Sequence, residues 1–341
     1  MILAGGMSTR LYPLTKTVPK PLVPIAGEPN AGHIMRYLHS FGIDEVAINV
    51  HYLSEKIVEA FGDGSAYGVT LHYSHEDVLM GSAGGVKRLE AFLRDDTFVV
   101  IGCDEVTDMR LDALLAFHEK REAIATIGLV HAEDVTQYGV VILDESGRIV
   151  DFQEKPQLGH ERSHLVNTGV YIFEPAIFDR IPADTFFDFG KNVFPELQRA
   201  AAPFFGMSMQ GAYWRDIGTP DEYRAATRDV LEGKVRLLGT SRVRGYPADA
   251  VLGHDVRIEG DVRIGSGAML GAGARIIGPT VLGDDVEIGP AAIIENAIVW
   301  DGARIGAEAR VRDSIVGAGY RIEASANIAG AIVANEPEPV A

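Results

Sequence analysis

The sequence predicts an α/β fold with a mixed, mostly parallel sheet, followed by a left-handed parallel β-helix. Three observations lead to this expectation. Short apolar runs alternate with stretches of helical periodicity up to about residue 231, and from Ala250 large apolar residues recur every six positions. The length of 341 residues also favours two domains over one. We expect an N-terminal α/β domain at 1–232, a linker at 233–249, a β-helix at 250–334 and a disordered tail at 335–341.

Composition excludes several classes of partner. The net charge of −17 argues against nucleic acid or an anionic membrane surface, and implies that positive charge gathers where anionic substrates bind. Cys103 is the single cysteine, so an intrachain disulfide is excluded and a reducing compartment is favoured. No secretory signal or run of 18 apolar residues is present, so we expect a cytoplasmic enzyme. The chain begins almost inside its first strand, and we expect a few residues to be missing before Met1.

The first part of the chain reads as alternating strands and helices. Strands are predicted at 45–50, 69–73, 98–101, 123–130, 139–143, 149–152 and 167–173, with a hairpin turn at 145–147. Helices are predicted at 30–41, 54–61, 83–93, 111–121 and 220–231. Alternation of this kind favours right-handed crossovers, and ligands then bind beyond the carboxyl ends of the strands. One strand ends at Gly5 and another at Asp104, so we expect both to lie at one edge of the sheet.

Residues 3–11 form the first candidate site. Gly5 and Gly6 follow a short apolar run, and glycines at such a point let backbone N–H groups approach a phosphate. Arg10 supplies a planar fork of donors, and Lys20 a charge held between two prolines. A Walker loop and a dinucleotide-binding fingerprint are excluded, because the glycine and lysine spacing fits neither. The stretch therefore predicts a triphosphate cradle, and the alternative is a glycine turn with both cations on a solvated face.

Two further loops carry candidate chemistry. Three glycines within residues 81–85, at a helix start, suit close approach to a flat ring or a phosphate, or else a loop with unusual φ values. Asp104, at a strand end beside the phosphate loop, has the oxygen chemistry that holds a hard divalent cation. Its alternative role is to cap a helix or a turn.

The repeat after Ala250 is a hexapeptide pattern. Large residues at Leu252, Ile258, Ile264, Leu270, Ile276, Leu282, Ile288, Ile294 and Trp300 alternate with smaller ones in a second register from Ala250 to Ile298. Three hexads per triangular coil give three coils over 250–303, and a one-residue slip near Arg304 leads to looser repeats. Hexapeptide helices often occur in acyltransferases, but His254 is the only histidine beyond His164 that could serve as a base. We expect this module to serve oligomer assembly or effector binding.

Several strings together resemble the sugar-1-phosphate nucleotidylyltransferase family. The string from Gly5 to Leu22 is similar to the family's G-G-x-[GS]-T-R-L-x-P-L-T-x-x-x-P-K-P-L signature, with Ser8 where a third glycine is usual. Segments that resemble further family elements lie at 79–85, 99–108, 139, 154–156, 167–169, 188–191 and 214–220. Ser82 replaces threonine, Cys103 replaces glycine and Gly190 replaces serine.

The resemblance implies a Rossmann-like nucleotidyltransferase domain of the GT-A type at 1–232, and it assigns roles to particular residues. Its catalytic residues would be Arg10, Lys20, Asp104 and Asp216, and the two aspartates would hold Mg²⁺. The nucleotide would contact Leu3, Ala4, Gly5, Gly6, Ser8, Thr9, Arg10, Lys20, Glu76, Gly81, Ser82 and Ala83. The sugar 1-phosphate would contact Gly139, Glu154, Lys155, Asn167, Gly169 and Lys191.

The implied reaction transfers a nucleotide from a nucleoside triphosphate to a sugar 1-phosphate and releases pyrophosphate. Overall resemblance favours GTP and mannose 1-phosphate as the substrates. Glucose-1-phosphate uridylyl or thymidylyl transfer is an alternative, because the strings do not settle the base or the sugar. Two further alternatives are a catalytically weak regulatory subunit of such an enzyme and a hexapeptide acyltransferase. A homo-oligomer formed through the β-helix is the expected assembly.

Overall fold

The computed structural model describes residues 1–238 and 247–336. Parts of the predicted linker and tail, residues 239–246 and 337–341, lie outside this description. The chain forms two compact units. The first contains Met1–Gly6 and Ile34–Asp216, and the second contains Met7–His33 and Ile217–Ala341. The domain boundaries at 232 and 250 stay predictions.

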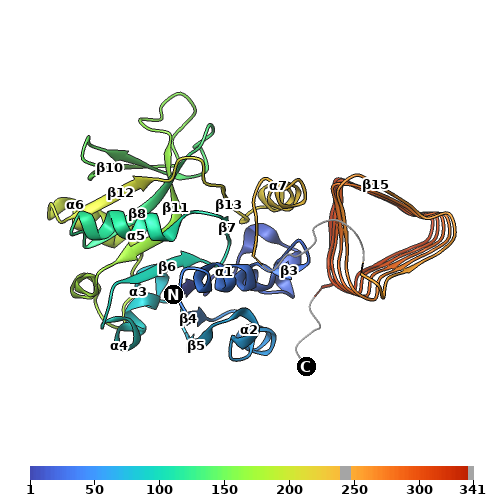
Figure 1. The fold of residues 1–341 in the computed structure, drawn as a ribbon, viewed down its shortest axis with the longest axis horizontal. Coiled ribbons are helices and arrows are strands. Elements are labelled where there is room, and N and C mark those ends of the chain that lie inside the picture. The colour runs from blue at the N-terminus through green and yellow to red at the C-terminus, as the bar shows by residue number, and fades with distance from the viewer. Residues whose placement is uncertain (239–246, 337–341) are drawn as a thin grey trace. The chain divides into compact units, whose positions relative to one another are not determined.

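The first unit is built on a nine-stranded sheet (Figure 1). Its main path runs β10-β9-β11-β6-β1-β4-β5, and β8 joins β11 to β12. Strands β6, β1, β4 and β5 are mutually parallel, and β11 adds an antiparallel extension. The strands are β1 (Ile2–Leu3), β4 (Glu45–Val50), β5 (Thr70–His75), β6 (Phe98–Gly102), β8 (Ala125–His131), β9 (Gly139–Leu143), β10 (Ile149–Glu154), β11 (Leu165–Phe173) and β12 (Phe204–Ser208).

A separate two-stranded pair, β7 (Glu105–Thr107) and β13 (Trp214–Asp216), belongs to the same unit. The helices are α1 (Asn30–His39), which crosses the boundary between the units, α2 (Ser54–Phe61), α3 (Gly81–Arg88), α4 (Glu90–Leu93), α5 (Leu111–Lys120) and α6 (Phe194–Arg199), with short turns η4 (Ser65–Tyr67), η5 (Pro175–Arg180) and η6 (Phe189–Val193). None of the helices among residues 1–238 and 247–336 is long and apolar enough to cross a membrane.

Most predicted elements are confirmed, with small shifts at their ends. The predicted helix 83–93 is two helices, because the backbone at Leu89 leaves helical geometry between α3 and α4. The strand β12 and the pair β7–β13 were not predicted. Leu3 pairs with both Asn49 and Gly102, so the parallel register places the ends of β1, β4 and β6 at one edge, as expected.

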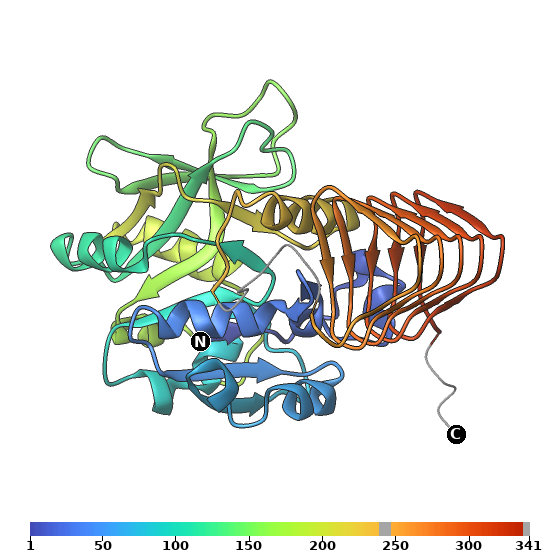
Figure 2. The same cartoon turned by 45° about the vertical axis from the view of Figure 1, so that its right-hand side comes forward.

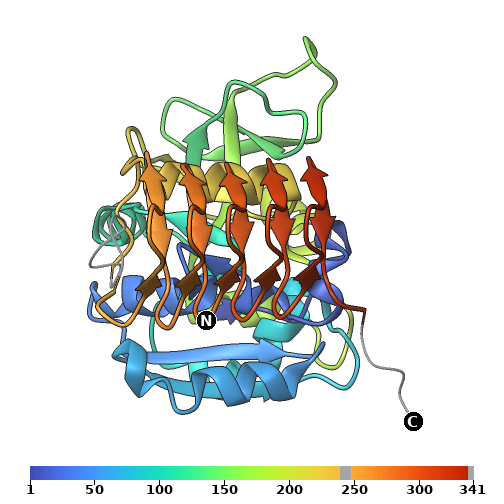
Figure 3. The ribbon, with the colours of Figure 1, turned by 90° about the vertical axis from the view of Figure 1, so that its right-hand side faces the viewer.

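The second unit contains the phosphate-loop segment and the repeat region. Outside the repeat it contains the short elements η1 (Thr9–Leu11), η2 (Leu14–Lys16), η3 (Lys20–Leu22), β2 (Pro24–Ile25) and β3 (Glu28–Pro29), and the longer helix α7 (Pro220–Leu231). The repeat forms three five-stranded parallel sheets, which enclose a triangular core (Figure 1) and stack as successive coils (Figures 2 and 3). This agrees with the predicted left-handed β-helix.

The repeat strands are two or three residues long. One sheet contains β14 (Val251–Leu252), β17 (Met269–Leu270), β20 (Glu287–Ile288), β23 (Arg304–Ile305) and β26 (Arg321–Ile322). The second contains β15 (Arg257–Glu259), β18 (Arg275–Ile277), β21 (Ile293–Glu295), β24 (Arg310–Arg312) and β27 (Asn327–Ala329). The third contains β16 (Val262–Ile264), β19 (Thr280–Leu282), β22 (Ile298–Val299), β25 (Ile315–Val316) and β28 (Ile332–Val333).

The slip in the repeat lies earlier than predicted. Leu282 pairs with Val299, so Val299 and not Trp300 continues the buried column, and the prediction of a slip near Arg304 is wrong. The physical cause is the length of one turn. Only Asn296 and Ala297 lie between the end of β21 and Ile298, whereas in the preceding coil three residues lie between the end of β18 and Val281, the residue that pairs with Ile298. Later coils keep the shorter spacing, with Val299 paired to Val316.

Candidate functional site

A buried network fastens the end of β1 to its neighbours. The Ala4 N–H donates to Asn49 Oδ1 at 2.8 Å, and Asn49 Nδ2 donates to Glu76 Oε1 at 2.9 Å. Glu76 Oε2 accepts the Met80 N–H at 3.1 Å. Because both Glu76 oxygens bond within the protein, Glu76 positions the loops here. Asn49 was missed by sequence reasoning, since a polar residue in an apolar strand run was the only signal.

Gly5 and Gly85 leave room for the side chains of Asn49 and Glu76. A Cβ at Gly5 would lie 2.9 Å from Asn49 Nδ2, and one at Gly85 would lie 2.7 Å from Glu76 Oε1. Both distances are too short for an added carbon, so these two positions need glycine because of the protein's own side chains. A Cβ at Gly6 would meet nothing within 4 Å. Of these glycines, Gly6 therefore has room for a ligand to approach its backbone.

The rest of the phosphate-loop segment belongs to the second unit. Ser8 has φ 52° and ψ 47°, the left-handed region, and its carbonyl accepts the Thr15 hydroxyl at 2.8 Å. This conformation explains why the family usually has glycine there. Thr9 and the exposed Arg10 form η1, and Lys20, with 9% of its surface exposed, begins η3. Asp104 and Asp216 lie in the first unit, so a joint contact of Arg10, Lys20 and these aspartates with one triphosphate stays a prediction.

The start of α3 is built around another segment of the chain. The N–H groups of Ala83 and Gly84 both donate to Phe187 O at 3.0 Å, and a Cβ at Gly81 would lie 2.5 Å from the same oxygen. Ser82 donates to Asp188 Oδ2 at 2.9 Å and accepts the Phe189 N–H. The glycines here therefore serve close approach of the protein's own backbone. Contact of Gly81, Ser82 and Ala83 with a nucleotide stays a prediction.

The two aspartates predicted to hold a metal lie on neighbouring elements. Asp104 lies in the turn between β6 and β7, and Asp216 ends β13. Strands β7 and β13 are antiparallel, with Asp216 opposite Glu105, the residue that follows Asp104. Carboxylate oxygens suit a hard cation such as Mg²⁺, so this pair has the right donor chemistry. Within 1–238 and 247–336 no group of three or more His, Cys, Asp or Glu residues is arranged to hold a metal ion.

Five of the six predicted sugar-phosphate residues lie on β9, β10 and β11 or directly after β10, and Lys191 lies in η6. Gly139 of β9 pairs with Glu154 of β10, whose side chain lies outside the described part of the structure. The next residue, Lys155, is exposed and has φ 41°, and its N–H donates to Tyr138 O at 3.1 Å. Asn167 accepts the Gly169 N–H at 3.0 Å inside an irregular stretch of β11. These three strands of one sheet are thus brought together at its antiparallel side.

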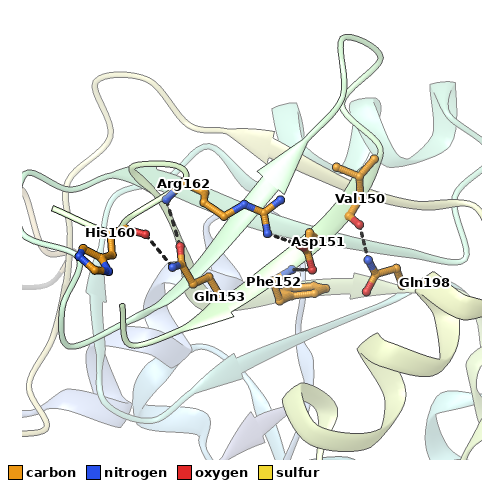
Figure 4. Close-up of polar contacts among 7 residues, drawn as sticks. All are labelled: Val150, Asp151, Phe152, Gln153, His160, Arg162 and Gln198. Atoms are coloured by element: carbon orange, nitrogen blue, oxygen red, sulfur yellow. Dashed lines mark hydrogen bonds and ion pairs between the residues drawn. The ribbon is translucent and has the colours of Figure 1, made fainter. Parts of the chain in front are cut away.

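The loop after Lys155 is fastened back onto β10 (Figure 4). Gln153 donates to His160 O at 2.8 Å and accepts the Arg162 N–H at 3.0 Å. The Arg162 guanidinium pairs with Asp151. Lys155 is therefore held between an ordered strand and a tethered loop, which limits the positions that its ammonium group can reach. Lys191 is exposed in η6, and its N–H donates to Asp188 Oδ1.

Tyr171 connects several of these groups. Asn167 Nδ2 donates to its hydroxyl at 3.1 Å. Burial raises the pKa of Tyr171 far above its ordinary value, and the carboxylates of Glu105, Asp188 and Asp104 raise this pKa further. The phenol therefore stays protonated over the physiological range. The same effect shows that three carboxylates from two segments, 104–105 and 188, lie near one buried ring.

The fold and these residues define an α/β enzyme with glycine loops and carboxylates at the strand ends and a β-helix at its C-terminal side. The model of the family "Nucleotidyl transferase" matches residues 1–233, and the model "GMPPB C-terminal domain" matches residues 258–338. The chain belongs to the nucleotidyl transferase family. Members of this family act on a nucleoside triphosphate and a sugar 1-phosphate.

Particular relatives agree with this assignment. A UTP--glucose-1-phosphate uridylyltransferase of Synechocystis sp. is 36% identical over 87% of this chain and 81% of its own length. A mannose-1-phosphate guanylyltransferase of Mycobacterium tuberculosis is 33% identical over 87% of this chain and 78% of its own length. The crystal structure of HddC from Yersinia pseudotuberculosis superposes with a TM-score of 0.59 and 26% identity, covering 67% of this chain and 97% of that one.

Proposed function

We propose that this protein forms GDP-mannose and pyrophosphate from GTP and mannose 1-phosphate. The observation that carries the proposal is the joint match of two models, a nucleotidyl transferase domain and a GMPPB C-terminal domain, in one chain. The mannose-1-phosphate guanylyltransferase of M. tuberculosis supports it, since the match spans 87% of this chain. The register that brings Asp216 beside the Asp104–Glu105 turn supports a phosphoryl-transfer site.

In the proposed reaction, an oxygen of the sugar phosphate attacks the α-phosphorus of the triphosphate in line. The bond from the α-phosphorus to the bridging oxygen breaks, and pyrophosphate leaves with the electron pair. Positioning and charge neutralisation supply most of the rate, and no covalent protein intermediate is needed. Arg10 would stabilise the departing pyrophosphate, Lys20 the triphosphate, and Lys155 the attacking sugar phosphate.

Asp104 and Asp216 would hold Mg²⁺, since their carboxylates supply the oxygen ligands that this ion prefers. When bound, Mg²⁺ supplies charge neutralisation at the phosphates. Tyr171, Asn167 and Gly169 form a hydrogen-bonded group beside the carboxylates, and they shape the wall against which the sugar would lie.

Uridylyl transfer to glucose 1-phosphate is the second candidate. It is favoured by the Synechocystis relative, which is 36% identical to this chain. The N–H groups of Ala83 and Gly84 in the loop 79–85 donate to Phe187 O and so give no reason to prefer one base. Thymidylyl transfer is tested with the same assay.

The test is pyrophosphate release by the purified protein, measured across GTP, UTP, dTTP, ATP and CTP with mannose 1-phosphate and glucose 1-phosphate. We expect the highest kcat/KM with GTP and mannose 1-phosphate. A higher value with UTP and glucose 1-phosphate would replace our proposal by the second candidate. No turnover with any pair would favour a regulatory subunit, and consumption of acetyl-coenzyme A would favour an acyltransferase.

We also propose that the β-helix mediates a homo-oligomer. Two of its coils carry exposed apolar residues in register, Val251 and Met269, on one outer sheet. Light scattering coupled to size-exclusion chromatography of the full chain tests this, with Met269→Glu as the disrupting variant. A monomer at micromolar concentration would contradict it.

A further inference from the structure

Glu105 carries a buried carboxylate beside the two aspartates. It begins β7 directly after Asp104, and 7% of its surface is exposed. Trp214 Nε1–H donates to Glu105 Oε2 at 2.6 Å and also lies 2.8 Å from Thr168 O. Because burial strengthens a hydrogen bond by reducing its screening, this is a strong link between β7 and β13.

Two glycines make room for this carboxylate. The register of β11 and β6 pairs Val170 with Ile101, which puts Gly169 opposite Gly102. A Cβ at Gly169 would lie 2.4 Å from Glu105 Oε1, and a Cβ at Gly102 would lie 2.9 Å from the same atom. Neither distance allows a side chain without displacement. The space for Glu105 is therefore built into two neighbouring strands of the main sheet.

Trp214 connects Glu105 to two parts of the predicted site, Asp216 and Tyr138. Along β13 it lies two residues before Asp216, which pairs with Glu105 itself. Toward β9, its ring and the Tyr138 ring make an edge-to-face contact with a centroid distance of 5.2 Å and an interplanar angle of 66°. The Tyr138 carbonyl accepts the Lys155 N–H at 3.1 Å. A single indole thus contacts the support of Lys155 and shares a strand with Asp216.

We propose that Glu105 is a positioning residue that acts through Trp214. By holding the indole, it sets the place of Asp216 relative to Asp104, and it supports the Tyr138 backbone that fixes Lys155. The inference rests on the proposed function, in which Asp104 and Asp216 hold the divalent ion and Lys155 meets the sugar phosphate. Residues that orient metal ligands and substrate contacts change affinity when removed, even without touching the ligand.

Three variants separate the parts of this proposal. Glu105→Ala removes the acceptor, Trp214→Phe removes only the donor and keeps an aromatic ring, and Glu105→Gln keeps a carbonyl oxygen that can accept the indole N–H. The matched control is Glu174→Ala. Glu174 accepts the Thr97 hydroxyl at 2.6 Å directly after β11 ends, away from Asn167, Gly169 and Trp214.

Two measurements apply: the dissociation constant for Mn²⁺, followed by electron paramagnetic resonance as a stand-in for Mg²⁺, and the separate kcat and KM for the sugar 1-phosphate. We expect Glu105→Ala and Trp214→Phe to weaken Mn²⁺ binding and to raise the KM by about 10-fold or more. Glu105→Gln stays within about 3-fold of the parent, because the hydrogen bond is kept. Glu174→Ala lowers the unfolding temperature and leaves both constants unchanged.

Unchanged Mn²⁺ binding and KM in Trp214→Phe would overturn the proposal, and this variant decides the matter if Glu105→Ala does not fold. Equal impairment of Glu105→Gln and Glu105→Ala would also overturn it, because the negative charge and not the hydrogen bond would then be what matters. Mn²⁺ binding is measured without turnover. If the parent binds Mn²⁺ but releases no pyrophosphate with any pair, the proposed function fails while the role of Glu105 is still tested.

Discussion

Asp216 lies directly opposite Glu105 in the antiparallel pair of β13 and β7. The chain separates them by more than a hundred residues, yet this register brings Asp216 to the residue that follows Asp104. Two short strands therefore unite carboxylates from the middle and from the C-terminal end of the first unit's sequence. The pairing gives the predicted metal ligands a common frame, which each strand alone could not supply.

Removing the charge of Asp104 or of Asp216 tests whether the two residues hold a metal ion together. We expect Asp104→Asn and Asp216→Asn each to lower the rate of pyrophosphate release by about 100-fold or more, since each removes an anionic ligand of the proposed ion. The double variant should lose little beyond either single one, because residues that act as a unit are not additive. Rates at saturating Mg²⁺ and circular dichroism spectra check this. A folded single variant with full activity would disprove the metal assignment.

The sequence predicted the ends of β1 and β6 and their shared edge because glycines and an aspartate follow short apolar runs. It could not predict that Glu105 is buried. Its carboxylate fits only because Gly102 and Gly169 lack side chains and because Trp214 arrives from β13, and these contacts depend on long-range register. Similarly, the hexad pattern predicted the coils, but the loss of one residue at the turn after β21 showed only in the pairing of Leu282 with Val299.

The three departures from the family strings differ in their physical consequences. Of Ser8, Cys103 and Gly190, only Ser8 has a positive φ. A Cβ at Gly190 would have no contact closer than 3.4 Å, so the position has room for the serine that is usual in the family. The geometry thus gives Gly190 and Cys103 no strained backbone.

Ser8 is therefore the departure to vary. The left-handed conformation costs a non-glycine residue about 1–2 kcal/mol, while glycine loses about 0.5–1 kcal/mol through its greater freedom in the unfolded chain. We expect Ser8→Gly to raise the free energy of unfolding by up to about 1 kcal/mol and to keep the KM for the triphosphate. Ser8→Val should be destabilised and should bind the triphosphate less well, because a branched side chain is a genuine outlier there. Equal urea midpoints for all three proteins would contradict this.

The network of Asn49 and Glu76 makes a separate prediction about stability. Asn49→Ala removes the acceptor of the Ala4 N–H and a hydrogen-bond donor to the buried Glu76 carboxylate. We expect a loss of about 2–4 kcal/mol in the free energy of unfolding, since a buried charged acceptor loses a hydrogen bond. Asn49→Asp, which keeps the shape but faces Glu76 with a second carboxylate, should lose at least as much at pH 8. Guanidinium unfolding measures both, and a loss below about 0.5 kcal/mol in Asn49→Ala would refute the role of this network.

His118 makes stability depend on pH. The ring is buried between α5 and β8, with Nδ1 2.8 Å from Thr126 Oγ1 and Nε2 3.1 Å from Glu174 Oε1. Burial lowers the pKa of His118 below its ordinary value of 6.5, although hydrogen bonding to Glu174 acts in the other direction. In the neutral ring, Nε2–H donates to Glu174 and Nδ1 accepts the Thr126 hydroxyl.

Because the folded protein binds this proton less readily than the unfolded chain, protonation favours unfolding. The contribution of His118 is therefore complete above about pH 6.5 and is lost as the pH falls through the folded pKa, with a slope of at most about 1.4 kcal/mol per pH unit. We expect urea unfolding between pH 5 and 8 to show this decline, and His118→Gln, whose amide does not titrate, to remove this contribution. His254→Gln, at a histidine whose side chain is 83% exposed, is the matched control and should keep the parent slope. If His118→Gln also kept the parent slope, His118 would not be the group that titrates.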